Sequence, residues 1–131
     1  MESQARYKFA IYRVPGLFAV VRLDAGSVVP EWASLGLLST VVRTPEEVCV
    51  VCDQTQVPPD VLCDRDWVPL KIEGPLALSL TGVLSSLLSP LSTHGIAVFV
   101  LSTFETDYIL VKQSQVALAQ TVLREEGHLL S

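Results

Sequence analysis

The clearest pattern of hydrophobic and polar positions in this chain lies between residues 78 and 95. Its apolar residues recur at the spacing of one helical face, at Val83, Leu84, Leu87, Leu88 and Leu91. Gly82 precedes this face, and Gly95 stands where a left-handed helix stop is expected. Pro90 disagrees with the pattern, because a proline inside a helix deletes a hydrogen bond and costs about 3 kcal/mol. We therefore expect a helix after Gly82, with a kink or a late end near Pro90.

Runs of apolar residues on both sides of this helix predict strands. They cover residues 17–23, 37–43, 48–52, 61–73, 96–101 and 108–112. Residues 30–34 predict a short helical turn, and the Pro58-Pro59 pair limits residues 54–60 to one turn at most. A second helix is expected after Ser114 as its N-cap, ending at Gly127 before a short strand at 128–130.

The order strand, helix, strand, strand, helix, strand thus occurs twice, in abbreviated form in residues 14–66 and fully in residues 67–131. A weak internal echo supports duplication, because residues 41–46 match residues 100–105. The sequence predicts an α+β fold of two ferredoxin-like βαββαβ units in tandem, packed together: an N-terminal abbreviated unit (1–66) and a C-terminal unit (67–131). No flexible spacer separates them, so we expect one continuous core and a buried Trp67 at the junction.

The strand at residues 96–101 is apolar on both faces. A sheet covered by helices on one side has a polar second face when that face meets water. Two-sided apolar character therefore predicts contact with a second domain or a second chain, and we expect a homodimer.

Composition narrows the range of partners. The chain has 131 residues, 50% of them hydrophobic, but no apolar run approaches the roughly 20 residues that a membrane span needs. The N-terminal residues show no secretory signal, so we expect a cytoplasmic protein without a membrane partner. A net charge of −5 without a basic stripe argues against nucleic acid as a partner.

Three cysteines are too few for a disulfide scaffold. Cys49 and Cys52 form a C-x-x-C string, but residues three apart on a strand point to opposite faces and cannot bind one metal ion. The chain carries no G-x-G-x-x-G, P-loop, G-x-S-x-G or H-E-x-x-H string. We therefore expect inert thiols, no catalytic residues, no metal site and no cofactor.

Several of these segments resemble the ACT-domain family. They are residues 80–84, the helix-to-strand junction at 95–98, and above all the Ser-Thr-x-x-x-Asp-Tyr string and its flanking strands at 101–111. Residues 14–20 and 70–75 are similar to the tandem CASTOR-type branch, small bacterial proteins with two ACT-like units whose eukaryotic relatives sense arginine. The resemblance spans residues 14–130. It implies a regulatory or sensing module that binds amino acids and has no catalysis of its own.

A turn glycine at a helix start lets backbone N–H groups approach a carboxylate, which the helix dipole favours. An ammonium or basic side chain then needs an acidic acceptor, and Asp107 or Glu105 is placed for that role. The turn residues and the resemblance together give these candidate ligand-binding positions: Thr81, Gly82, Ser85, Thr103, Phe104, Thr106 and Asp107.

Several alternatives remain open from the sequence, among them an active site that assembles from distant residues without a recognisable motif. Residues 103–107 also fit a polar turn with no ligand role, since Thr and Asp are ordinary turn residues. Lys71 and Glu73 fit solvated or ion-paired side chains better than ligand contacts. The chain as a whole also fits a pure oligomerisation module that binds no ligand.

Overall fold

The computed structural model describes residues 8–77 and 81–131 of the chain. Their contacts divide the chain into two compact units. The N-terminal unit is Pro15–Trp67, and the C-terminal unit combines Val68–Ser131 with the described residues up to Val14. The strand β5 (Cys63–Ile72) crosses the boundary, so its first half belongs to one unit and its second half to the other.

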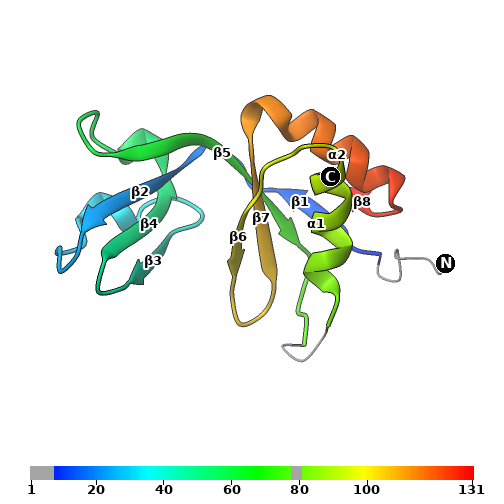
Figure 1. The fold of residues 1–131 in the computed structure, drawn as a ribbon, viewed down its shortest axis with the longest axis horizontal. Helices are drawn as coiled ribbons and strands as arrows, with labels where there is room; N and C mark the ends of the chain where they lie inside the picture. The colour runs from blue at the N-terminus through cyan, green and yellow to red at the C-terminus, as the bar shows by residue number, and fades with distance from the viewer. Residues whose placement is uncertain (1–7, 78–80) are drawn as a thin grey trace. The chain divides into compact units, whose positions relative to one another are not determined.

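The N-terminal unit contains four strands and two short 3-10 turns. Along the chain these are β2 (Phe18–Asp24), η1 (Glu31–Ser34), β3 (Thr40–Arg43), β4 (Glu47–Asp53), η2 (Gln54–Gln56) and the first half of β5. The strands lie in the order β3, β4, β2, β5, with each neighbouring pair antiparallel (Figure 1). This is the strand order of a ferredoxin-like unit in which each helix is reduced to a single 3-10 turn.

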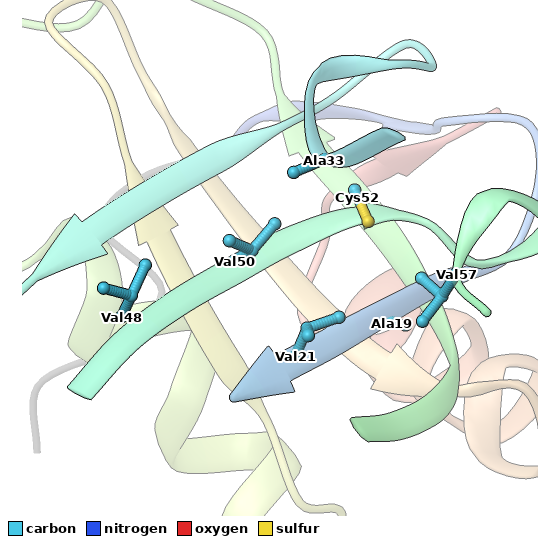
Figure 2. Packing of buried hydrophobic residues seen from close by; sticks show 7 residues of the cluster. All are labelled: Ala19, Val21, Ala33, Val48, Val50, Cys52 and Val57. Carbon is cyan, nitrogen blue, oxygen red and sulfur yellow. The ribbon is translucent and has the colours of Figure 1, made fainter. Parts of the chain in front are cut away.

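A small apolar core lies on one face of this sheet (Figure 2). Its members come from β2, β4 and the segments around the two turns: Ala19, Val21, Ala33, Val48, Val50, Cys52 and Val57. Alternation along β4 sends Cys52 into this core and Cys49 to the opposite face, as the sequence predicts. Burial, aided by Asp53, raises the pKa of the Cys52 thiol to about 11, so the thiol stays protonated and unreactive near neutral pH.

The described residues of the C-terminal unit form five strands and two α-helices. They are β1 (Ala10–Arg13), the second half of β5, α1 (Val83–Thr93), β6 (Phe99–Ser102), β7 (Asp107–Lys112), the 3-10 turn η3 (Gln113–Gln115), α2 (Val116–Glu125) and β8 (Leu129–Leu130). The strand order is β6, β7, β5, β1, β8 (Figure 1). Strand β1 is antiparallel to β5 and parallel to β8, so it is inserted into what is otherwise a ferredoxin-like order.

The first helix agrees with its sequence pattern. Gly82 adopts φ +80° at its N-cap and Gly95 adopts φ +73° just past its end, two conformations that favour glycine. Val83, Leu87 and Leu91 are buried on one face. The helix passes through Pro90 and ends three residues later, at Thr93, which confirms the predicted late end.

Other predicted elements differ from the structure in their limits. The strand expected at 96–101 begins only at Phe99, and the strand expected at 37–43 begins at Thr40. Ser114 is not the N-cap of α2, because it lies inside η3 and Gln115 takes the cap position. The strand expected at 61–73 is β5, from Cys63 to Ile72, and it shifts in register against β2 near Asp66, which adopts φ +71°.

The division between the units also differs from the predicted one at the N-terminus. The boundary falls between Trp67 and Val68, next to the expected position, and Trp67 is buried at 8% exposure, as predicted. The described residues before Pro15, however, group with the C-terminal unit, whereas the sequence predicts that they belong to the N-terminal one. The reason is β1, a strand that the apolar pattern did not reveal and that pairs with both β5 and β8.

Candidate functional site

A pocket of about 370 Å³ lies within the C-terminal unit, between the first turn of α1 and the turn that joins β6 to β7. This volume is near the lower end for small-molecule sites, which suits a ligand of single-amino-acid size. The pocket is lined by Leu76, Ala77, Gly82, Val83, Leu84, Ser85, Ser102, Thr103, Phe104, Thr106 and Asp107.

Six of the seven predicted site residues line this pocket, although they come from two segments about twenty residues apart: Gly82, Ser85, Thr103, Phe104, Thr106 and Asp107. The seventh, Thr81, is exposed just before Gly82 and is not among the lining residues. Five lining residues were not in the predicted set. One of them, Ser102, could have been predicted from the sequence, because a four-residue turn between two strands places it directly opposite Asp107.

The start of α1 supplies backbone donors to the pocket. In the first backbone hydrogen bond of this helix, the Ser86 N–H donates to the Gly82 carbonyl at 3.1 Å. The N–H groups of the three residues before it therefore have no acceptor within the helix, as at any helix N-terminus. No side chain among the described residues caps this end. The Ser85 hydroxyl donates to the Gly82 carbonyl at 3.2 Å, which keeps its oxygen at the edge of the pocket.

The turn between β6 and β7 is held by two threonines. The N–H and the hydroxyl of Thr103 both donate to the Thr106 carbonyl, at 2.8 and 3.1 Å. Thr106 is buried, and its hydroxyl donates to the Ile72 carbonyl of β5 at 2.6 Å. Both hydroxyl protons are therefore used inside the protein, which indicates that these threonines shape the pocket.

Asp107 is the only charged side chain among the lining residues of the described chain. It is half-buried, and its Oδ1 accepts a hydrogen bond of 2.7 Å from the Ser102 hydroxyl directly across the hairpin. That bond orients the carboxylate without neutralising it. Asp107 therefore offers a fixed negative charge on the side of the pocket formed by the hairpin.

The remaining walls are mostly apolar. Leu76, Ala77 and Leu84 line the pocket together with Phe104, which lies in the turn between β6 and β7 and is 80% exposed. The carbonyl of Glu105, next to Phe104, accepts a 2.6 Å hydrogen bond from the Leu76 N–H. This bond fastens the segment that carries Leu76 to the turn.

Lys71 and Glu73 are not among the lining residues. The Lys71 ammonium lies over the ring of Tyr108, 5.8 Å from its centroid. A hydrogen bond to Glu73 raises the pKa of the Tyr12 hydroxyl above its usual value. Both charged side chains thus have surface partners of their own.

The N-terminal unit contains a corresponding hairpin without the same chemistry. Arg43 faces Val48 across β3 and β4 just as Ser102 faces Asp107 across β6 and β7, 59 residues later in both strands. Val48 is buried in the apolar core, and the unit has no α-helix among its elements. The carboxylate and the helix start therefore occur together only in the C-terminal unit, among the described residues.

Comparison with known proteins places these features in a family. The family model for the ACT domain matches residues 62–125 of the chain, and a separate model for an N-terminal domain matches residues 16–60. The chain belongs to the ACT-domain family. The matched ACT region contains α1, β6 and β7, and so every element that lines the pocket.

Individual relatives support this assignment. The protein Atu0741 from Agobacterium tumefaciens has 35% sequence identity and a TM-score of 0.90, covering 95% of this chain and 93% of that one. The cytosolic arginine sensor for mTORC1 subunit 1 from Bos taurus is 26% identical over 98 residues, which are 66% of this chain and 30% of the sensor. This chain thus spans less than half the length of that relative.

The fold also occurs in a metabolic enzyme. Clostridium acetobutylicum aspartate kinase, described as an allosteric enzyme, matches with a TM-score of 0.68 at 11% identity, over 96% of this chain and 36% of the kinase chain. At that identity the match shows the fold alone. In residues 8–77 and 81–131, no helix is long and apolar enough to cross a membrane, and no group of three or more His, Cys, Asp or Glu side chains is arranged to hold a metal ion.

Proposed function

We propose that this ACT-domain protein is a regulatory module that binds a free amino acid in the pocket between α1 and the β6–β7 turn, without catalysis of its own. One observation carries the proposal: the helix start at Gly82 and the carboxylate of Asp107 line the same pocket. These two groups are complementary to the two charges of an amino acid. The cytoplasmic location expected from the sequence belongs to the same proposal.

The carboxylate of the ligand is assigned to the first turn of α1. Backbone N–H groups without an acceptor in the helix, together with the helix dipole, favour an anion there. The positive φ of Gly82 and its missing side chain let a ligand approach this backbone closely.

The ammonium of the ligand is assigned to Asp107. Charge-assisted hydrogen bonds contribute roughly 1.5 to 3 kcal/mol each, so two of them support binding in the micromolar to millimolar range once the entropy of association is deducted. Affinity in this range suits a sensor of a free metabolite.

The relatives are compatible with such a role. The bovine relative is named as an arginine sensor, and the kinase with the same fold is described as allosteric. The first name refers to sensing of a small molecule and the second to allosteric control, and for this chain they support a regulatory role without specifying the ligand.

The same proposal includes a homodimer formed through β6. Among the described residues this strand pairs only with β7, and the side chains of Phe99, Val100 and Leu101 are only partly buried. An apolar edge strand without charges is suited to pairing with a second strand. The same observation favours the second candidate function, in which the module only builds an assembly and binds no ligand.

Ligand binding by the full chain tests the proposal directly. A thermal-shift screen of the twenty amino acids followed by calorimetry should identify at least one ligand, because a ligand at 100 times its dissociation constant stabilises the fold by about 2.7 kcal/mol. The substitution Asp107→Asn keeps the shape and removes the charge, so it should weaken binding by about tenfold or more.

Glu105→Gln is the matched control. It removes the neighbouring carboxylate of the same turn, which is exposed and is not among the lining residues, so affinity should be unchanged. If none of the twenty amino acids binds, the sensor function is wrong and the assembly function remains. Equal affinity of Asp107→Asn and the parent protein would show that the ligand binds elsewhere.

A further inference from the structure

The distribution of charge around the pocket restricts the kind of amino acid that fits it. From Gly74 to Phe104 the sequence contains no Asp, Glu, Lys or Arg. This stretch supplies all lining residues except Thr106 and Asp107. The pocket therefore has one formal negative charge and no formal positive charge on its side chains, and the residues that precede α1 add none.

From this arrangement we infer that the pocket selects an amino acid with an uncharged, apolar side chain of medium size and discriminates against arginine and lysine. The inference rests on the proposed function and specifies its ligand class. A zwitterionic ligand uses the single carboxylate for its α-ammonium. A basic amino acid brings a second cation, and the lining has no second carboxylate to receive it.

The cost of that second cation follows from general electrostatics. A charge moved from water into an apolar environment without a partner is strongly disfavoured. If the guanidinium of arginine took Asp107 instead, the α-ammonium would lose its partner. Either arrangement leaves one cation without a carboxylate partner among the lining side chains, which include the apolar Leu76, Ala77 and Leu84. Specificity is a difference of affinities, and this unpaired charge is the repulsive element that rejects basic ligands.

Phe104 supplies the attractive element. Its side chain is 80% exposed and lines the pocket, so it can bury much apolar area by closing on a ligand. Aromatic side chains bury large areas and lose little conformational freedom, which makes them effective contacts for aliphatic and aromatic groups. An apolar side chain between Phe104 and Leu84 gains this contact, and a hydrated charged side chain does not.

Calorimetry with the full chain tests the inference. The probes are L-leucine, L-isoleucine, L-phenylalanine, L-arginine and L-lysine, with N-acetyl-L-leucine as an analogue that lacks the ammonium. We expect at least one apolar amino acid to bind about tenfold or more tightly than arginine or lysine, as expected for one unpaired charge. N-acetyl-L-leucine should show no measurable binding, because its amide cannot pair with Asp107 as a cation.

Two variants separate the side-chain contact from a general effect on the fold. Phe104→Ser should weaken the apolar ligand by about fivefold to tenfold, as expected for a loss of about 1 kcal/mol of aromatic contact. Leu129→Ser is the matched control, since Leu129 is 73% exposed on β8 and is not among the lining residues. It should leave affinity unchanged.

The outcomes are distinct. If arginine or lysine binds as tightly as the apolar amino acids or more tightly, the selectivity is wrong and the amino-acid sensor function stands. If apolar amino acids bind but Phe104→Ser binds them as well as the parent does, the assigned contact is wrong. If no amino acid binds at all, the proposed function fails and this inference fails with it.

Discussion

At the scale of single residues, His128 shows how one buried polar side chain connects distant parts of the C-terminal unit. Its Nδ1 accepts a hydrogen bond of 3.1 Å from the Phe9 N–H, and the two rings stack with centroids 5.7 Å apart. The backbone N–H of His128 donates to the Leu123 carbonyl, near the end of α2. Burial lowers the pKa of His128, the nearby Lys8 ammonium lowers it further, and Glu126 opposes the shift.

This arrangement predicts a loss of stability in mild acid. The pKa of His128 is lower in the folded protein than in the unfolded chain, where the pKa of a histidine is about 6.5. The unfolded state therefore takes up more protons as pH falls below that value, and the free energy of unfolding decreases. Protonation also removes the lone pair that accepts the Phe9 N–H. Urea unfolding at pH 7.5, 6.5 and 5.5 should show this decrease.

The second histidine provides the control. His94→Asn, at an exposed position, should keep the pH dependence between 6.5 and 5.5, and His128→Asn should reduce it. Because the chain has only two histidines, both can be followed by NMR titration. A pKa of His128 at or above about 6.5 would contradict the prediction.

At the scale of elements, the β6–β7 hairpin positions the carboxylate side of the candidate site. The hairpin from β3 to β4 is built in the same way, since the Thr44 hydroxyl accepts hydrogen bonds from the N–H groups of Glu46 and Glu47 and donates to the Glu47 carbonyl. Thr103 occupies the corresponding position in the second hairpin. The second hairpin is also fixed to β5, through the buried Thr106 hydroxyl.

Thr106→Val should therefore destabilise the protein. The change keeps the side-chain shape but removes the 2.6 Å hydrogen bond to the Ile72 carbonyl, at an expected cost of about 1 to 2 kcal/mol. Thr93→Val is the control, because its hydrogen bond to the Ser89 carbonyl is exposed on the surface of α1 and its loss should cost less than about 0.5 kcal/mol. Urea unfolding measures both, and equal costs for the two variants would show that the Thr106 contact does not hold the turn.

At the scale of the whole molecule, the proposed assembly rests on β6. Among the described residues this strand pairs with β7, at one end of the sheet of the C-terminal unit, and its apolar side chains are half-buried within one copy of the chain. Isologous antiparallel pairing of two such strands places apolar residues opposite each other.

We predict that the chain is a dimer at micromolar concentration and that Val100→Lys shifts it to a monomer. A lysine in this strand lies opposite its copy or close to it in an isologous pair, and like charges there are destabilising. Leu118→Lys, on an exposed position of α2, should leave the dimer intact. Light scattering decides the matter, with circular dichroism to verify folding. A parent protein that is strictly monomeric would refute the dimer.

The expectation of one core shared by both units stays a prediction. Strand β5 contributes residues to each unit, and Trp67, at the end of its first half, is buried. Calorimetry of the full chain tests the expectation, since a shared core requires a single unfolding transition and independent units give two.

The sequence alone determined the elements whose patterns are local. The apolar spacing from Val83 to Leu91 and the two glycines at its ends specified α1, because helix periodicity and positive φ values are properties of short segments. The echo between residues 41–46 and 100–105 likewise corresponded to two equivalent hairpins. Local chemistry pointed to Gly82 and to an acidic acceptor at Asp107 or Glu105, and the resemblance to the ACT-domain family implied the other lining residues that were expected, Ser85, Thr103, Phe104 and Thr106.

The tertiary structure decided what depends on contacts between distant segments. Strand β1 has only four residues and pairs with β5 and β8, far away in sequence, so no local periodicity marked it. The N-cap of α2 is Gln115 and not the predicted Ser114, because a 3-10 turn that includes Ser114 precedes the helix. Leu76 and Ala77 line the pocket on a segment that a backbone hydrogen bond from Leu76 connects to the turn at Glu105. Local patterns specify which elements form, and long-range pairing determines which of their side chains meet.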